Sequence, residues 1–177
     1  MSTITTVMPV LRGAHPERRT APYENWRPPV IGMSLLVPVG SDSLVVADLR
    51  DLILMPTGSV HDGRKPSEAA HDVLHGAPQG LPLLRRVALA CTQMRRRKVI
   101  THIWATAPMT REDVGALSYH DPRADIRVLP TMRVLNELTQ PGRLRILVAL
   151  QALATGETAY IEGGIVQPST PPDLANE

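Results

Sequence analysis

Apolar runs separated by short polar turns divide the first part of this chain into predicted strands. Two such runs, 31–39 and 43–49, flank the turn sequence Gly40-Ser41-Asp42, and this arrangement predicts a β-hairpin. The next run, 52–60, predicts a short strand that leads into a loop. The pattern up to residue 60 is therefore typical of β structure.

A second hairpin is predicted from two longer apolar runs, 85–93 and 99–107. The basic cluster Arg95–Lys98 connects these runs and would form the tip of the hairpin. Side chains alternate between the two faces of a strand, so every second residue of the later run is expected on the same face. The residues expected together on one face are Ile100, His102 and Trp104.

Helical signals appear at three places. The segment 66–75 begins with proline, which suits a first helical position, and it predicts a helix. Leucine and isoleucine recur at helical spacing over 141–153, which predicts a final helix that Gly156 terminates. Thr110 and Asp113 form a capping-box-like pair, so a short helical turn is expected there.

The pattern predicts one folded domain between two flanking segments. Residues 1–29 are rich in proline and arginine without a sustained period, and we expect an extended N-terminal arm. Residues 30–163 form the expected domain, in which a strand at 125–130 follows a loop at 118–125. Residues 164–177 are polar and proline-rich, and we expect a disordered tail.

Composition restricts the class of protein. The chain has 177 residues, of which 43% are hydrophobic and 20% charged, as is ordinary for one soluble globular domain. A net charge of +2 does not by itself indicate a nucleic-acid partner. The single cysteine, Cys91, excludes an intramolecular disulfide and a thiolate-rich metal site. Since no secretory signal is visible and no apolar run approaches the ~18 residues needed to span a membrane, we expect a cytoplasmic protein.

One segment, residues 54–81, carries a spaced set of glycine, charged and apolar residues, LMPTGSVHDGRKPSEAAHDVLHGAPQGL. It resembles the signature of the Nudix family, which reads Gly, five residues, Glu, seven residues, Arg-Glu, an apolar residue, any residue, Glu-Glu, any residue, Gly and an apolar residue. Gly58 stands at the opening glycine and Leu74 at the apolar position, while Gly80-Leu81 closes the signature one residue late. The resemblance covers about residues 30–155.

The resemblance implies an α+β fold, namely a Nudix-like α/β/α sandwich around a mixed β-sheet. It also implies a loop-helix-loop site, in which the family holds Mg²⁺ with glutamates on one face of a helix. Here Val73, Gly76 and Ala77 stand at those glutamate positions, and none of them offers a metal ligand. We therefore expect a degenerate box without a metal site or cofactor, and the loss of classical pyrophosphohydrolase activity.

Two further positions of the signature carry the opposite charge. Arg64 stands where the family has its first glutamate, and Asp72 stands where the family has its arginine. This swap predicts an ion pair of reversed sign at the mouth of the loop. An exposed ion pair contributes roughly 0–1 kcal/mol, so the pair indicates the register of the alignment and not stability.

Histidines supply the candidate chemistry. His71 and His75 are four apart on the predicted helix, and His61 lies in the loop before it, so the three imidazoles could face one point. His61, Asp72 and His75 are the candidate catalytic residues, because an imidazole beside a carboxylate is a common proton shuttle. Three neutral imidazoles also suit Zn²⁺, but no cysteine or other fourth ligand reinforces the set. Exposed polar side chains and an ion pair are the simpler interpretation.

The candidate ligand-binding residues are Arg64, His71 and Trp104. Trp104 could stack on a bound base, although a single tryptophan on a strand is more often part of the core. The basic cluster Arg95–Lys98 could contact phosphates or RNA. No aromatic residues are interleaved with it, so a nucleic-acid partner is not expected.

Three functions remain open from the sequence. The first is a module that binds a small-molecule or nucleotide-like ligand, or an enzyme repurposed for another reaction in a specialised pathway. The second is an atypical Nudix hydrolase that acts on a nucleoside-diphosphate-type or other phosphoester substrate with histidine and aspartate. The third is a scaffold that forms a homodimer or binds a protein partner, which truncation of 1–29 and 164–177 would test. No membrane association is expected.

Overall fold

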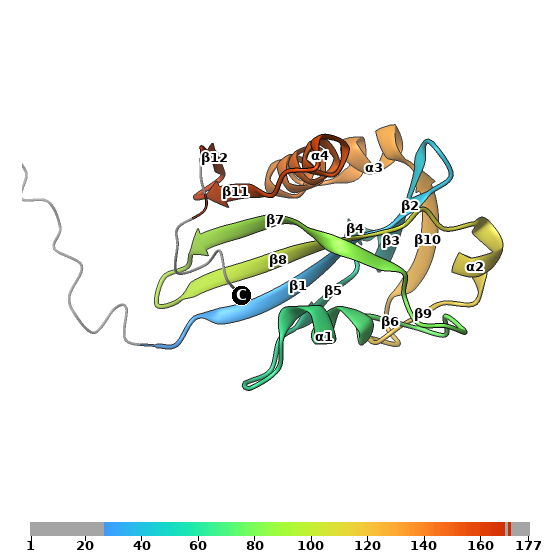
Figure 1. The fold of residues 1–177 in the computed structure, drawn as a ribbon, viewed down its shortest axis with the longest axis horizontal. Coiled ribbons are helices and arrows are strands. Elements are labelled where there is room, and N and C mark those ends of the chain that lie inside the picture. Colours follow the sequence, from blue (N-terminus) through green and yellow to red (C-terminus); the bar gives the residue numbers. More distant parts are fainter. Residues whose placement is uncertain (1–26, 169, 171–177) are drawn as a thin grey trace, which may run out of the picture.

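The computed structural model describes residues 27–168 and 170, and six strands form its largest sheet. These strands are β1 (Val30–Leu36), β5 (Thr57–Ser59), β7 (Leu83–Gln93), β8 (Lys98–Thr106), β11 (Ala159–Glu162) and β12 (Ile165–Gln167). They lie in the order β12-β11-β7-β8-β1-β5 (Figure 1). The sheet is mixed, because β1 runs parallel to β8 and β11 parallel to β7, while the other neighbours are antiparallel.

Two smaller sheets adjoin the large one. The four-stranded sheet consists of β2 (Pro38–Val39), β3 (Ser43–Leu49), β4 (Leu52–Leu54) and β10 (Asp125–Pro130). In it β3 is the central strand and pairs antiparallel with the three others. The two-stranded sheet joins β6 (Leu74–His75) to β9 (Ser118–Tyr119).

Helices cover both faces of the central sheet. They are α1 (Pro66–His71), α2 (Arg111–Gly115), α3 (Thr131–Glu137) and α4 (Gln140–Thr155). In Figure 1, α3 and α4 lie on one side of the sheet and α1 lies on the other. The predicted α+β class and α/β/α sandwich are therefore confirmed. No helix of residues 27–168 is both long enough and apolar enough to cross a bilayer.

Aliphatic side chains fill the space between the layers. Ile146 and Ala149 of α4 belong to the same buried cluster as Ile103 of β8. On the opposite face, Ala70 of α1 and Met33 of β1 belong to a second buried cluster. Trp104 packs against this second cluster, so the predicted alternation of β8 is confirmed.

Several predicted elements are confirmed. Strands β7 and β8 form the predicted antiparallel hairpin, in which Gln93 pairs with Lys98. Strand β10 has the predicted bounds, and α4 extends the predicted final helix slightly at both ends. Gly156 caps α4 with a φ of 80°, a left-handed conformation that glycine adopts readily. Thr110 and Asp113 form the predicted capping box of α2.

The first predicted hairpin is correct only in its second half. The turn at Gly40-Ser41-Asp42 does join β2 to β3, with Pro38 opposite Leu44. However, β1 leaves this hairpin and joins the six-stranded sheet between β8 and β5. Its last four residues are all buried, as expected for a central strand that is covered on both faces.

Other predicted boundaries also change. The single strand predicted over 52–60 is divided into β4 and β5, which belong to different sheets. The predicted loop 118–125 contains β9. Ile165–Gln167, which we assigned to the disordered tail, forms β12, because a turn at Gly163-Gly164 returns the chain antiparallel to β11. The remainder of that tail beyond 170, and the arm up to residue 26, lie outside the described residues.

Candidate functional site

The segment with the Nudix-like spacing forms β5, a loop, α1 and β6. We call residues 60–65 the box loop. A side chain at Gly58 would meet Val73, because a Cβ placed there lies 3.0 Å from Val73 Cγ2. The opening glycine therefore allows close contact between β5 and the chain that follows α1.

Helix α1 is shorter than predicted, and this changes the geometry of the box. Pro66 occupies its first turn, and Lys65 N donates to the Glu68 carboxylate over 3.2 Å. The helix ends at His71, and Asp72 is its C-cap. Beyond it the chain extends into β6, so His75 does not lie on a helix. The prediction that His71 and His75 share one helical face is therefore wrong.

The predicted ion pair of reversed sign is present. An Nη1 hydrogen of Arg64 binds Oδ2 of Asp72, joining the box loop to the end of α1. Both side chains are open to solvent, with exposed fractions of 40% and 54%. The hydrogen bond from Arg64 is the main cause of the lowered pKa of Asp72. The opposite charges of Arg64 and Asp72 thus hold the box loop against the end of α1.

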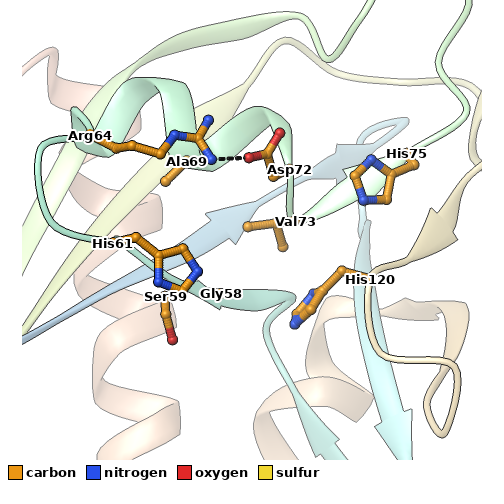
Figure 2. Close-up of a pocket in the computed structure, with 9 residues that line it drawn as sticks. All are labelled: Gly58, Ser59, His61, Arg64, Ala69, Asp72, Val73, His75 and His120. Atoms are coloured by element: carbon orange, nitrogen blue, oxygen red, sulfur yellow. Dashed lines mark hydrogen bonds and ion pairs between the residues drawn. The ribbon is translucent and has the colours of Figure 1, made fainter.

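A cleft of about 350 Å³ opens beside this pair. We define the cleft by the polar side chains that line it and by Val73 at its base. Figure 2 shows these side chains arranged around Val73, with the Arg64–Asp72 pair on one side. The polar residues of the cleft are Ser59, His61, Arg64, Asp72, His75 and His120. Val73 itself is buried and belongs to the cluster beneath α1.

Four of the predicted site residues thus meet at the cleft, namely His61, Arg64, Asp72 and His75. Two others do not line it. His71 is exposed on α1, and Trp104 is half-buried on β8 among apolar side chains. The position of Trp104 therefore gives no support to stacking on a ligand in this cleft.

His120 is a cleft residue that the sequence did not indicate. It follows β9, which pairs with β6 so that Tyr119 lies opposite Leu74. The backbone N–H of His120 donates to Val73 O over 3.3 Å. No local pattern around residues 118–125 predicts this contact, because it depends on the pairing of β6 with β9, two strands that lie far apart in the sequence.

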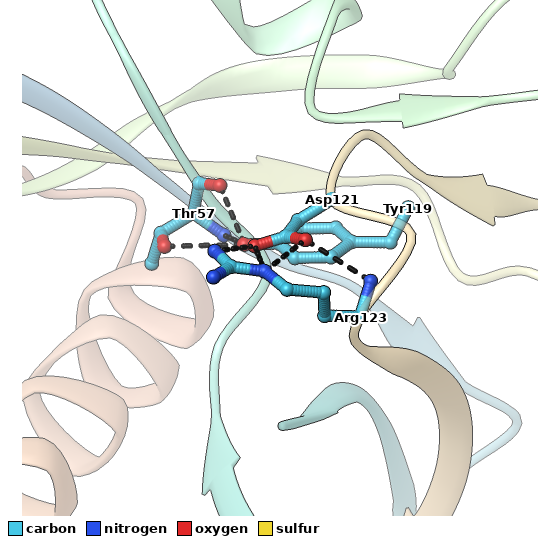
Figure 3. A network of polar contacts seen from close by, with 4 residues as sticks. All are labelled: Thr57, Tyr119, Asp121 and Arg123. Atoms are coloured by element: carbon cyan, nitrogen blue, oxygen red, sulfur yellow. Dashed lines mark hydrogen bonds and ion pairs between the residues drawn. The ribbon is translucent and has the colours of Figure 1, made fainter. Parts of the chain in front are cut away.

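A second set of polar contacts holds the loop that carries His120 (Figure 3). The Tyr119 hydroxyl donates to Thr57 O over 2.7 Å and accepts from Thr57 N over 3.1 Å. Arg123 binds Asp121, with 2.7 Å between Nη2 and Oδ2, and this hydrogen-bonded pair lowers the pKa of Asp121 to about 2. Tyr119 thus fastens the loop to β5, directly beside the cleft.

The donor set of the cleft differs from that of a magnesium site. Mg²⁺ takes oxygen ligands, usually carboxylates and phosphates. The lining residues offer three imidazoles, a guanidinium, the Ser59 hydroxyl and one carboxylate, which is already bound to Arg64. Within the described residues, no group of three or more histidine, cysteine or acidic side chains is placed to hold a metal ion. These residues do not fit Mg²⁺.

Gly76 and Ala77, where the resemblance would place the paired glutamates, have little room for larger side chains. Gly76 has a φ of 100°, and a Cβ added there would lie 2.2 Å from the carbonyl oxygen of Ala116. Ala77 is partly buried against the cluster beneath α1 and lines a different hollow, one that His61 does not line. The chain after α1 therefore follows a path that differs from a continued helix.

No known family profile matches this chain, and no curated protein matches it by sequence. Solved structures do match its fold. The solution structure of the E. coli ORF135 protein has a TM-score of 0.54 and 14% identity, and the match covers 72% of this chain and 91% of that one. The crystal structure of a Nudix hydrolase from Nitrosomonas europaea has a TM-score of 0.50 and 8% identity, with coverage of 77% and 78%. Identities this low indicate a shared fold.

Proposed function

We propose that this chain, which has the fold of Nudix hydrolases, uses its cleft to bind a small, nucleotide-like ligand without magnesium-dependent cleavage of a diphosphate. The observation that carries the proposal is the state of Asp72. It is the one carboxylate among the residues that line the cleft, and it is paired with Arg64. A bound Mg²⁺ would have to displace this arginine and would still lack further acidic ligands.

The size of the site supports a small-molecule ligand. The cleft has about 350 Å³, and an adjoining hollow of about 390 Å³ shares Ser59, His61 and Arg64 with it. Ligand pockets in proteins commonly occupy roughly 300–1,000 Å³. A ligand that enters at Arg64 can therefore extend from the cleft along the box loop.

The experiment combines a binding assay with a turnover assay. Purified protein is incubated with a mixed panel of nucleoside diphosphates and related phosphoesters in MgCl₂, and released phosphate is measured. The same panel is then tested for protection against thermal unfolding. We expect protection by at least one ligand and no release of phosphate. Release of phosphate that depends on Mg²⁺ would contradict the proposal.

A second candidate function is favoured by the three histidines that line the cleft together with Asp72. Imidazoles can donate and accept protons without a metal, so an atypical hydrolase of phosphoesters is the alternative. In that case His75→Ala or His120→Ala would abolish turnover in EDTA, while His71→Ala, outside the cleft, would retain it. Full turnover in the variants of both His75 and His120 would exclude this mechanism.

A further inference from the structure

We infer that the cleft binds a tetrahedral oxyanion, such as a phosphate or phosphomonoester group, directly and without a divalent cation. The groups that bind it are the Arg64 guanidinium and the imidazoles of His61, His75 and His120. The inference rests on the proposal that the cleft is a ligand site, and it names the chemistry of the ligand. Asp72 holds Arg64 in the free protein and competes with the oxyanion for it.

The donors reach the cleft from three segments of the chain. His61 and Arg64 belong to the box loop, His75 to β6, and His120 to the loop after β9. Figure 2 shows the three rings and the guanidinium around the side chain of Val73. A carboxylate ligand has two oxygens, whereas a phosphate has at least three, so a tetrahedral oxyanion can accept from more of these donors at once.

Backbone hydrogen bonds hold the donors in place before any ligand arrives. Val60 N donates to Ile31 O over 3.0 Å, which attaches the start of the box loop to β1, and Arg64 N donates to His61 O over 3.1 Å, which closes a turn within the loop. His120 is fixed by the bond from its own N–H to Val73 O. Because the backbone that carries these donors is already ordered in the free protein, oxyanion binding costs less conformational entropy.

The Arg64–Asp72 pair gives the cleft an internal competitor. Both partners are substantially exposed, and exposed ion pairs are weak because water and salt screen them. An entering oxyanion can therefore take the place of Asp72 on Arg64, with the imidazoles adding hydrogen bonds that Asp72 does not supply. Removal of the Asp72 charge should then strengthen binding.

Two acids lie close to the histidines of the cleft and its neighbourhood. Asp72 interacts electrostatically with His71 and His75, and Asp121 interacts with His120. Both acids are held by arginines, which keep the pKa of Asp72 lowered and that of Asp121 at about 2. Both acids therefore stay ionised and paired with their arginines near neutral pH.

The test is a titration of the full-length protein with sodium sulfate and with inorganic phosphate in EDTA, followed by ¹H–¹⁵N NMR of the imidazole side chains. Sulfate is dianionic near neutral pH and presents four acceptor oxygens to the donors of the cleft. We expect saturable shifts at His61, His75 and His120. Replacing EDTA with MgCl₂ should leave the affinity unchanged.

Matched variants separate the cleft from general electrostatics. Arg64→Gln should weaken sulfate binding roughly tenfold or more, because a charge-assisted donor is lost. Asp72→Asn should strengthen it. The control is Arg133→Gln, which also removes an exposed arginine from an ion pair, that with Glu137 over 2.6 Å, but on α3 at the opposite face of the sheet. The control should bind sulfate like the parent protein, and circular dichroism verifies that each variant is folded.

Three results would overturn the inference: no saturable sulfate binding, binding that requires Mg²⁺, or equal affinity in Arg64→Gln and Arg133→Gln. Failure of the proposed function looks different. If nucleotide-like ligands protect the protein while neither sulfate nor phosphate binds, only the inference fails. If nucleoside diphosphates are cleaved with Mg²⁺, the proposed function fails, whatever the affinity for sulfate.

Discussion

Single residues explain why helix α1 does not continue beyond His71. Gly76 adopts a φ of 100°, which side chains other than glycine rarely accept, and its α-carbon faces the backbone of Ala116 closely. Val73, three positions earlier, is buried against Gly58 and the apolar cluster beneath α1. A glutamate at either position would need the surrounding backbone or core to move. The conformation of this segment therefore depends on glycine at position 76 and on an apolar side chain at position 73.

Gly76→Ala should be strongly destabilising for this reason. We expect the free energy of unfolding to fall by about 2–4 kcal/mol, since the new Cβ combines an unfavourable φ with a clash against a backbone oxygen. Gly80→Ala is the matched control, because Gly80 also has a positive φ, 77°, but open space around its α-carbon. It should lose only about 1–2 kcal/mol. Urea denaturation measures the free energy of unfolding of both variants. Equal losses in Gly76→Ala and Gly80→Ala would show that the contact with Ala116 has no effect.

His102 provides a test of pH dependence that is independent of the cleft. It is fully buried on β8, and burial, with Arg86 beside it, lowers its pKa from 6.5 to about 4. Between these values the unfolded chain binds a proton that the folded protein does not, so stability is greatest above pH 6.5 and falls as the pH drops towards 4. The loss attributable to His102 should be on the order of 2–3 kcal/mol.

Urea denaturation at several pH values between 4.5 and 7.5 checks this prediction. In His102→Gln the side chain no longer titrates, so stability should depend less on pH over that interval, whatever the absolute stability of the variant. If the free energy of unfolding changes equally with pH in the parent protein and in His102→Gln, the prediction is wrong.

At the scale of elements, the site depends on how three short segments are joined. Helix α1 stops after a few residues, β6 follows it, and β6 pairs with β9 from a distant part of the chain. The hydroxyl of Tyr119 then bonds to both the N–H and the carbonyl of Thr57 in β5. This side chain links the segment that precedes the box loop to the segment that carries His120.

Tyr119→Phe should therefore loosen the site. We expect a loss of about 1–3 kcal/mol, because the backbone groups of Thr57 lose a partly buried partner. Amide hydrogen exchange at residues 57–59 should accelerate. Tyr160→Phe is the control, because the buried Tyr160 hydroxyl lies near Cys91 and Glu162 but makes no hydrogen bond of regular geometry to the described residues. If Tyr119→Phe is no more destabilising than Tyr160→Phe, the link between Tyr119 and Thr57 does not support the site.

At the scale of the whole molecule, the two faces of the sheet are coupled through shared strands. Leu36 of β1 and Ile103 of β8 belong to the cluster beneath α4, while Leu35 and Trp104 of the same strands belong to the cluster beneath α1 or pack against it. A change on the α4 face should therefore lower the stability of the entire domain, including the cleft on the other face, in one cooperative transition.

Ile146→Ala tests this coupling. Ile146 is buried in α4, and its truncation should cost about 2–5 kcal/mol. The neighbouring Leu147 is 46% exposed, so Leu147→Ala should change stability by no more than about 0.5 kcal/mol. Circular dichroism and tryptophan fluorescence should report the same midpoint for Ile146→Ala. Separate midpoints would mean that the two faces unfold independently.

The local pattern of the sequence determined much of the secondary structure and part of the site. The β7–β8 hairpin, β10, α4 with its Gly156 cap and the capping box of α2 depend on periodicity, turns and caps, which act over a few neighbouring residues. The box spacing placed His61, Arg64, Asp72 and His75 in one segment, and the charges of Arg64 and Asp72 predicted their ion pair.

Only the tertiary structure decided which strands became neighbours and where the site was completed. In the folded protein β1 pairs with β8 and β5 and not with the first hairpin, and α1 ends before His75. Strand β11 pairs with β12, and the pairing of β6 with β9 places His120 beside Val73. Strand partners are chosen by burial and hydrogen bonding between residues far apart in the chain. A short sequence window does not contain those partners, which is why the fourth donor of the cleft became visible only in the folded molecule.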